Sequence, residues 1–292
     1  MLDATSPRDR RRRLLAVGWG IALTAALVVG PLASVALGAD PEPTPTPTPT
    51  ATPIPTTIAY RLNLLRSGDF IRQYTRYQCV GASLQIMRNI IWSSNNRGPT
   101  LQKKLWKIAR SNSLYKADGG ADAFGWTTAT ALSGHGRYVL VAAPTMAEAV
   151  AAAAKGMAAT HRPAGLMVWR GTHAWVMTGF EATADPNATD EFRVVTIRMA
   201  DPLWPVYHVA AHRVYRPGMR LYTGGALKKN FTPYHDARRD GRIEGRFVAI
   251  VPIPDGDPLP DFAWAPKVGP QSSPTPSPTP SPTPSPEPTA AP

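Results

Sequence analysis

The sequence contains a single cysteine, Cys79, in 292 residues. One thiol cannot form an internal disulfide, and it cannot supply the two or more thiolates of a zinc–cysteine cluster. Acidic residues are also scarce, with 20 Asp and Glu against 32 Lys and Arg. No recognised module of interleaved aromatic and basic residues accompanies this charge, and no internal repeat is present. The sequence therefore predicts neither a nucleic-acid-binding protein nor a repeat protein.

The first 39 residues have the composition of an export signal. Residues 8–13 contain five arginines, and residues 14–38 carry no charge. An apolar run of that length is sufficient to span a bilayer, and the positive-inside rule would keep the arginines in the cytoplasm. Small residues at 36–39 also provide a cleavage site. The sequence thus predicts an extracytoplasmic protein and leaves open a signal peptide (secreted) or a membrane anchor.

Two tracts rich in proline flank the remaining chain. Residues 40–57 repeat Pro-Thr, and residues 268–292 repeat Ser-Pro-Thr-Pro. Proline at every second position removes backbone donors and favours an extended polyproline II spacer, so neither tract can form a core. We interpret the first tract as a linker that holds a domain off the membrane and the second as a disordered tail.

Residues 58–267 form the predicted folded domain, long enough for one well-buried core. They contain 27 Lys and Arg against 15 Asp and Glu, a net charge of +12. Such a charge indicates either a solvated basic surface or attraction to anionic cell-wall polymers, a membrane surface or acidic substrates. An unpaired thiol outside the cell is exposed to oxidation, which favours a cysteine kept for its reactivity.

Hydrophobic periodicity predicts helices first and strands later within this domain. A broad apolar stripe indicates a buried helix that begins near Cys79, and Thr145 and Glu148 form a capping-box pattern. We therefore predict an α+β fold in which an N-terminal helical half packs on a C-terminal antiparallel sheet. The further predicted helices are 99–112, 124–134 and 146–159. The predicted strands are 138–141, 164–170, 173–180, 192–199, 207–215 and 247–253, with a basic, glycine-rich loop at 216–246.

Four residues have the types and positions that thiol acyl-transfer chemistry requires. Cys79 lies at a helix N-terminus, where the helix dipole favours negative charge and so a nucleophilic sulfur. His173 opens a strand after the Gly171-Thr172 hairpin signal, and Asp201 closes the next strand, so pairing of these strands brings both to one sheet edge. Gln73, six residues before the cysteine, is placed to donate to an oxyanion. Taken singly, these residues also fit a small buried cysteine, a strand-end histidine and an Asp-Pro turn.

The pattern Gln-x5-Cys, then an amphipathic helix, Gly-x-His-Ala-x-Val-x-x-Gly-Phe and Asp-Pro resembles the bacteriocin-processing (double-glycine) cysteine peptidases of the papain-like clan. The resemblance covers about residues 70–205 and implies a papain-like cysteine peptidase fold. It also implies that Cys79 is the nucleophile, His173 the base, Asp201 the orienting residue and Gln73 the oxyanion donor. The family has glycine directly after its cysteine, whereas Val80 follows here and glycine comes one position later.

The resulting expectation is an exported cysteine peptidase-like hydrolase that cleaves a peptide or amide bond of an unidentified peptide or protein substrate at the cell surface. Three alternatives stay open. A transglutaminase-like acyl transferase and a peptidoglycan-cleaving cysteine endopeptidase share the order of cysteine and histidine, although the 94 residues that separate Cys79 from His173 argue against both. A non-catalytic wall-binding module on a proline-rich stalk fits the linkers and the charge equally well.

The remaining histidines and tryptophans indicate no further site. His208 and His212 lie four residues apart on one face of a predicted strand, but no third ligand has a natural place, so we predict no metal and no cofactor. Trp175 and Trp204 flank the predicted base and orienting residue. For these two tryptophans we favour core packing over a role in shielding the pair from water.

Overall fold

The computed structural model describes residues 57–115, 119–206, 208–209, 212–235 and 241–267. All of these belong to one unit of the chain, Ile54–Pro292. The predicted signal or anchor, nearly all of the linker and the proline-rich tail lie outside the described residues. Among the helices that the structure describes, none combines the length and the apolar character needed to cross a membrane.

In the described part of the chain, eight strands form one sheet in the order β10-β2-β9-β3-β4-β5-β8, and β1 also pairs with β4. Every pairing in this sheet is antiparallel. The strands are β1 (Tyr60–Asn63), β2 (Tyr138–Ala143), β3 (Ala164–Val168), β4 (His173–Ala182), β5 (Val194–Ala200), β8 (Met219–Tyr222), β9 (Phe247–Pro252) and β10 (Ala263–Trp264).

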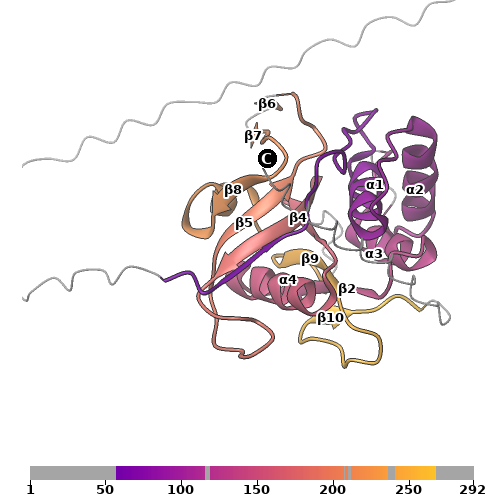
Figure 1. The fold of residues 1–292 in the computed structure, drawn as a ribbon. Coiled ribbons are helices and arrows are strands. Elements are labelled where there is room, and N and C mark those ends of the chain that lie inside the picture. Colours follow the sequence, from indigo (N-terminus) through magenta and orange to yellow (C-terminus); the bar gives the residue numbers. More distant parts are fainter. Residues whose placement is uncertain (1–56, 116–118, 207, 210–211, 236–240, 268–292) are drawn as a thin grey trace, which may run out of the picture. The chain divides into compact units, whose positions relative to one another are not determined.

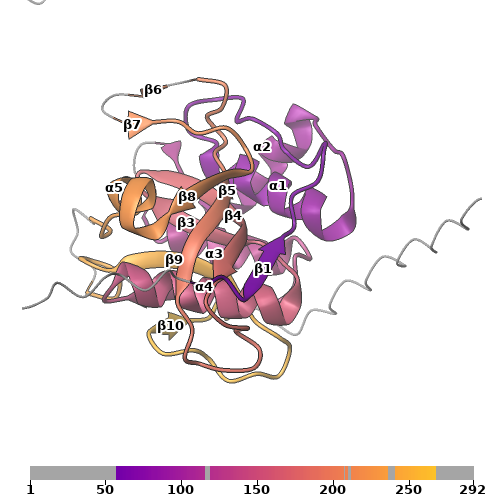
Figure 2. The ribbon, with the colours of Figure 1, turned by 60° about the vertical axis from the view of Figure 1, so that its left-hand side comes forward.

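Helices cover both faces of the sheet (Figures 1 and 2). One face carries α1 (Cys79–Trp92), α2 (Pro99–Ser111) and α3 (Ala123–Leu132), and the other carries α4 (Met146–Thr160). Alternate strand residues enter two separate cores, because successive side chains of a strand point to opposite faces. Val176 packs with the α1–α3 layer and Trp175 with the α4 layer.

This arrangement confirms the predicted α+β class and antiparallel sheet but corrects the predicted layering. The helices do not form one half packed on one side, because α4 covers the opposite face of the sheet. Both faces of the central strands are therefore buried, and all ten residues of β4 are buried. That burial explains why β2, β3 and β4 read as near-continuous apolar runs rather than alternating ones.

The strongest sequence signals gave the correct elements. The helix at Cys79 begins at that residue, and the capping box at α4 is present. In the capping box, the Glu148 N–H donates to Thr145 Oγ1 at 3.2 Å and the Thr145 N–H donates to Glu148 Oε2 at 2.9 Å. These reciprocal bonds satisfy two backbone donors that a helix start otherwise leaves unpaired.

Two predictions in the second half of the domain were wrong. The predicted strand 207–215 is a small separate hairpin of β6 (His208–Val209) and β7 (His212–Arg213). Val209 pairs with His212, so the chain reverses between them and no continuous strand is possible. The predicted loop 216–246 contains β8, a π-helical turn (Thr223–Leu227) and the short helix α5 (Lys228–Asn230).

β4 is the strand that positions the candidate site. Its first half pairs with β3 and its second half pairs with β1, on the same side of the strand. Gly179 is the residue of β4 at which pairing with β3 has ended and pairing with β1 begins. A Cβ at this position would lie 2.3 Å from Leu62 O. The glycine of the sequence motif is therefore explained by close backbone approach, which only a residue without a side chain permits.

Candidate active site

Cys79 is the first residue of α1, which packs against β4 (Figure 1). Its side chain is half-buried at the edge of the core on the α1–α3 side. The preceding Gln78 makes no side-chain cap, so no capping group competes for the first-turn N–H groups of α1. A sulfur at this position faces the positive end of the helix dipole and the unpaired donors of the first turn.

Gly81, two residues after the cysteine, has a structural reason to be glycine. A Cβ at this position would lie 2.7 Å from Trp106 Cβ and 2.9 Å from Gln102 O of α2. The glycine therefore allows α1 and α2 to approach closely. Helix packing thus accounts for the glycine at this position.

His173 and Asp201 form a buried pair at the end of the sheet. The His173 Nε2–H donates to Asp201 Oδ1 at 2.8 Å, and the two side chains are only 4% and 0% exposed. The Leu203 N–H donates to the same oxygen at 3.0 Å. Strand pairing produces this contact as predicted, because Val176 of β4 lies opposite Ala200 of β5, the residue before Asp201.

The other neighbour of the imidazole is Cys79. Burial lowers the pKa of His173, but hydrogen bonds to Asp201 and Cys79, together with their negative charges, raise it to about 9. Since Nε2 is bound to Asp201, Nδ1 is the ring nitrogen that remains for the sulfur. His173 therefore retains its proton at neutral pH. The structure brings Cys79, His173 and Asp201 into one cluster.

Gln73 lies beside the same corner of the sheet. The Gln73 backbone N–H donates to the carbonyl oxygen of Pro202 at 2.8 Å, and Pro202 is the residue that follows Asp201. Its side-chain Nε2 donates to Thr75 O at 2.9 Å, while its Oε1 is buried without a partner among the described residues. The structure thus places Gln73 next to the Asp201 turn, and its role as an oxyanion donor stays a prediction.

The segment that carries Gln73 is held by a residue that the sequence did not single out. Gln102 of α2 is fully buried, accepts the Tyr74 N–H at 2.8 Å and donates to Arg72 O at 3.0 Å. These bonds fix the backbone on both sides of Gln73. A buried glutamine on an amphipathic helix was the available signal, but the sequence does not reveal its partner thirty residues away.

Trp169 covers one face of the candidate base. Its ring stacks on His173 at 4.5 Å between centroids with an interplanar angle of 23°, and its other face stacks on His212 at 4.4 Å and 11°. The imidazole of His173 is therefore confined between Asp201, Cys79 and an indole plane. Core packing is the role predicted for Trp175 and Trp204, and Trp175 is a fully buried core residue, with Trp204 packed against the same core. The tryptophan that shields the histidine is Trp169.

The position of Trp169 depends on the hairpin between β3 and β4. Trp169 and Arg170 both have left-handed backbone conformations, with φ of 54° and 59°, which side chains other than glycine adopt at a cost. Asn230 of α5 holds this turn: its carbonyl accepts the Trp169 N–H and its Oδ1 accepts the indole Nε1–H, both at 2.8 Å. The predicted strand 164–170 therefore ends earlier, at Val168.

The other histidines make no metal site within the described residues, where no group of three potential ligands occurs. His212 belongs to the ring stack described above. His135 is completely buried, and its Nε2 lies 2.8 Å from Leu84 O. Burial, opposed in part by this bond, lowers the pKa of His135 to about 4. His135 is thus a neutral core residue.

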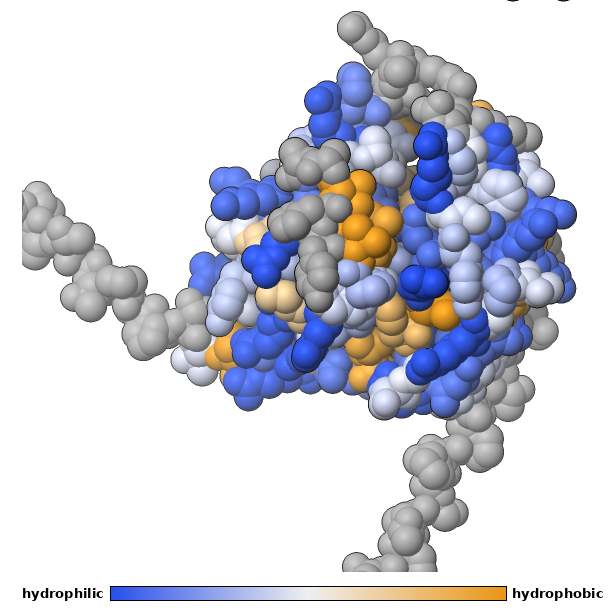
Figure 3. All heavy atoms as spheres, turned by 90° about the horizontal axis from the view of Figure 1, so that it is seen from above, coloured by the Kyte–Doolittle hydropathy of each residue, from blue (hydrophilic) through white to orange (hydrophobic). Residues whose placement is uncertain are grey.

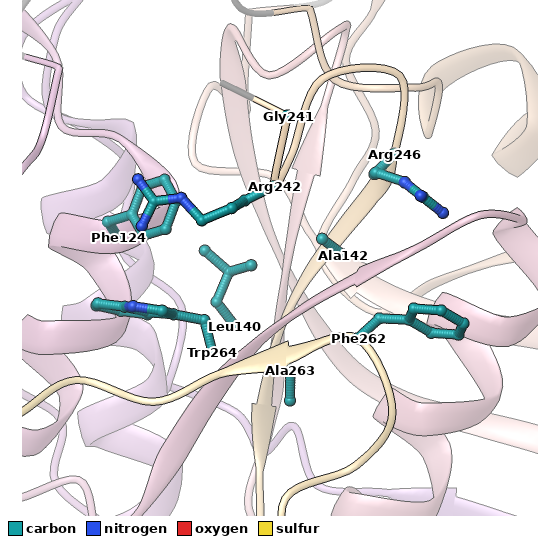
Figure 4. A pocket seen from close by; sticks show the side chains of 9 residues that line it. All are labelled: Phe124, Leu140, Ala142, Gly241, Arg242, Arg246, Phe262, Ala263 and Trp264. Carbon is teal, nitrogen blue, oxygen red and sulfur yellow. The ribbon is translucent and has the colours of Figure 1, made fainter. Parts of the chain in front are cut away.

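A separate pocket of about 270 Å³ lies at the β2–β10 edge of the sheet (Figure 4). Leu140 lies at its centre, with the rings of Phe124 and Trp264 on one side, and Arg242 extends over Phe124 at 4.7 Å from the ring centroid. None of the residues that line this pocket belongs to the cluster at Cys79. It is therefore not the cleft of the candidate active site.

Comparisons of the chain with family models, curated proteins and solved structures found no match. The geometry around Cys79 is therefore the basis for inferring a function.

Proposed function

We propose that this protein is a cysteine peptidase-like hydrolase of papain-like architecture that cleaves a peptide or amide bond. The observation that carries the proposal is the buried His173–Asp201 pair in contact with a thiol at a helix N-terminus. A nucleophile, a base and a group that orients the base are the three parts of thiol acyl transfer. Their chain order, cysteine then histidine then aspartate, agrees with the resemblance drawn from the sequence.

The proposed reaction begins with Cys79 as a thiolate and His173 as an imidazolium. The sulfur attacks the substrate carbonyl carbon, and the negative charge on the carbonyl oxygen is met by first-turn N–H groups of α1 and by the Gln73 amide. Collapse breaks the C–N bond, and His173 gives its proton to the leaving amine. A water molecule, deprotonated by His173, then hydrolyses the thioester and releases the acid. Asp201 stabilises the imidazolium throughout.

We further propose that this chemistry takes place outside the cytoplasm. The support is in the sequence: the arginine cluster and the uncharged run of residues 8–38, followed by a proline-rich linker. A reactive thiol in that compartment has no second cysteine in the chain with which to form an internal disulfide. The single cysteine also means that every thiol-directed reagent reports on Cys79 alone.

The experiment that tests the proposal is incubation of the full-length protein with a diverse peptide library, followed by mass spectrometry of new termini. We expect new N- and C-termini with the wild type and none with Cys79→Ala, while the surface variant Ser111→Ala cleaves normally. Gln73→Ala should lower turnover by about 10²-fold or more if its amide is an oxyanion donor. Transfer of the acyl group to an added amine, without free acid, would instead assign an acyl transferase. Absence of cleavage together with a slowly alkylated thiol would contradict the proposal.

A further inference from the structure

Four segments of the chain meet at the candidate active site. The Gln73 N–H bonds to Pro202, and the Trp169 ring lies between His173 and His212, so the segments are held together by direct contacts. The hairpin of β6 and β7 carries one of them, and the face that bears this hairpin is seen from above in Figure 3, where many hydrophilic residues and an apolar patch lie at the surface. The four segments are 72–79, 169–173, 201–206 and 212–219.

These segments carry five exposed arginines. None of the five forms an ion pair with a described carboxylate. Elsewhere in the same domain arginines do have carboxylate partners. Arg66 forms an ion pair with Asp69, and Glu181 forms ion pairs with both Arg61 and Arg220. Among the described residues, no carboxylate therefore pairs with the positive charge of these five side chains. The five are Arg72, Arg76, Arg170, Arg213 and Arg216.

Negative charge is scarce within these four segments. The four segments contain one acidic residue, Asp201, which is fully buried and bound to His173. The raised pKa of His173 adds an imidazolium at neutral pH. A cleft lined by one sign of charge concentrates ligands of the opposite sign and raises their association rate. The segments that meet around Cys79 thus carry an excess of positive charge.

The separation of the arginines from Cys79 and His173 along the chain limits how far from the scissile bond a negative charge of the substrate can lie. Arg76 lies three residues before Cys79, and Arg170 lies three residues before His173. At about 3.8 Å per residue, each Cα is within about 11 Å of its catalytic neighbour. A carboxylate that meets either arginine therefore lies within a few residues of the bond under attack, on a chain that enters the site. A flat anionic surface would not require charges on separate segments around a nucleophile.

We propose that the substrate is an acidic peptide, with Asp or Glu side chains, or a terminal carboxylate, within a few residues of the scissile bond. This inference rests on the proposed function and names the substrate class of the same site. Arg76, three residues before the cysteine, and Arg170, three residues before the histidine, are the specificity-determining residues. They bind the carboxylates as charge-assisted partners.

The test compares alkylation of Cys79 by iodoacetate, an anion, with alkylation by neutral iodoacetamide, in the full-length protein. The reference is the same ratio of rates for the protein unfolded in urea. We expect folding to raise the iodoacetate-to-iodoacetamide ratio by about tenfold at low ionic strength, and salt to reduce this gain. Arg76→Gln and Arg170→Gln should each lower the ratio. The control Lys267→Gln removes one exposed charge beside β10, four strands from β4, and should leave the ratio unchanged.

A second measurement separates acidic peptides from anionic membranes. Oligo-glutamate should slow iodoacetamide alkylation of Cys79 more than oligo-glutamine or oligo-lysine, and Arg76→Gln should weaken this protection. Protection by phosphatidylglycerol vesicles but not by phosphatidylcholine vesicles, with none from oligo-glutamate, would overturn the proposal and assign the arginines to a membrane. A ratio equal to that of the unfolded protein would overturn it as well. Either failure leaves the proposed hydrolase standing if iodoacetamide still reacts rapidly at low pH.

Discussion

Asp201→Asn separates the charge of the orienting carboxylate from its geometry. An asparagine Oδ1 can still accept the His173 Nε2–H and the Leu203 N–H, so the ring orientation should be kept. The negative charge beside a buried imidazole is lost. The comparison variant Asp201→Ala loses both the acceptor and the charge. Any difference between the two variants therefore reports on orientation, and the effect that they share reports on charge.

The expected size of the effect of Asp201→Asn on Cys79 alkylation follows from the pKa of His173. This pKa is raised from 6.5 to about 9, so the site, with the opposing effect of burial included, favours the imidazolium by about 3 kcal/mol. Removing the charge of Asp201 leaves the burial and the contribution of Cys79. We expect the pKa of His173 to fall below 7 in Asp201→Asn. At pH 7.5 the imidazolium then becomes a minority species, and the alkylation rate of Cys79 should drop at least about fourfold.

The assay combines NMR titration of the His173 ring with the pH profile of iodoacetamide alkylation. Both should shift together in Asp201→Asn, while Asp190→Asn, an exposed carboxylate in the β4–β5 loop, leaves them unchanged. If the His173 pKa stays near 9 in Asp201→Asn, the carboxylate is not the cause of the raised pKa and the electrostatic argument fails.

Three further predictions follow from named contacts. Trp169→Phe keeps the stack on His173 but loses the bond to Asn230, so we expect about 1 kcal/mol less stability with an unchanged alkylation profile, whereas Trp169→Ala should also slow alkylation. His135, neutral in the fold with a pKa of about 4, contributes stability that is complete above pH 6.5 and lost as the pH falls toward 4. This contribution to the free energy of unfolding should fall by about 2 kcal/mol between pH 7 and 4.5, and NMR that finds the ring titrating near 6.5 would contradict the prediction. Thr145→Ala should cost about 1 kcal/mol in thermal denaturation through loss of the capping box, and a change in Cys79 reactivity in this variant would refute the separation of α4 from the site.

Patterns that act within a few residues predicted the fold best. The helix at Cys79 and the capping box at Thr145 each depend on neighbours one or two turns away, so the local sequence contains the necessary information. The pairing of β4 with β5, which joins His173 to Asp201, followed from two adjacent strands. By contrast, β8 is an exposed edge strand with only Leu221 buried, and it carries no alternating pattern.

Contacts between distant segments could not be predicted from the sequence. The indole of Trp169 is held by Asn230, 61 residues later, within a region predicted as a loop. Gln102 holds the Gln73 segment from a different helix. A polar residue that becomes buried must find a hydrogen-bond partner, but the sequence does not say which one. The candidate catalytic residues were therefore accessible to sequence reasoning, whereas the residues that position them were not.

The most direct test of the account is the rate of iodoacetamide alkylation of Cys79 as a function of pH, beside His173→Ala. The account predicts rapid alkylation well below about pH 8.5, the ordinary pKa of a free thiol, and loss of this reactivity in the variant. Slow alkylation that rises only at alkaline pH in both proteins would contradict it. The chain would then be better described as a wall-binding module with an inert cysteine.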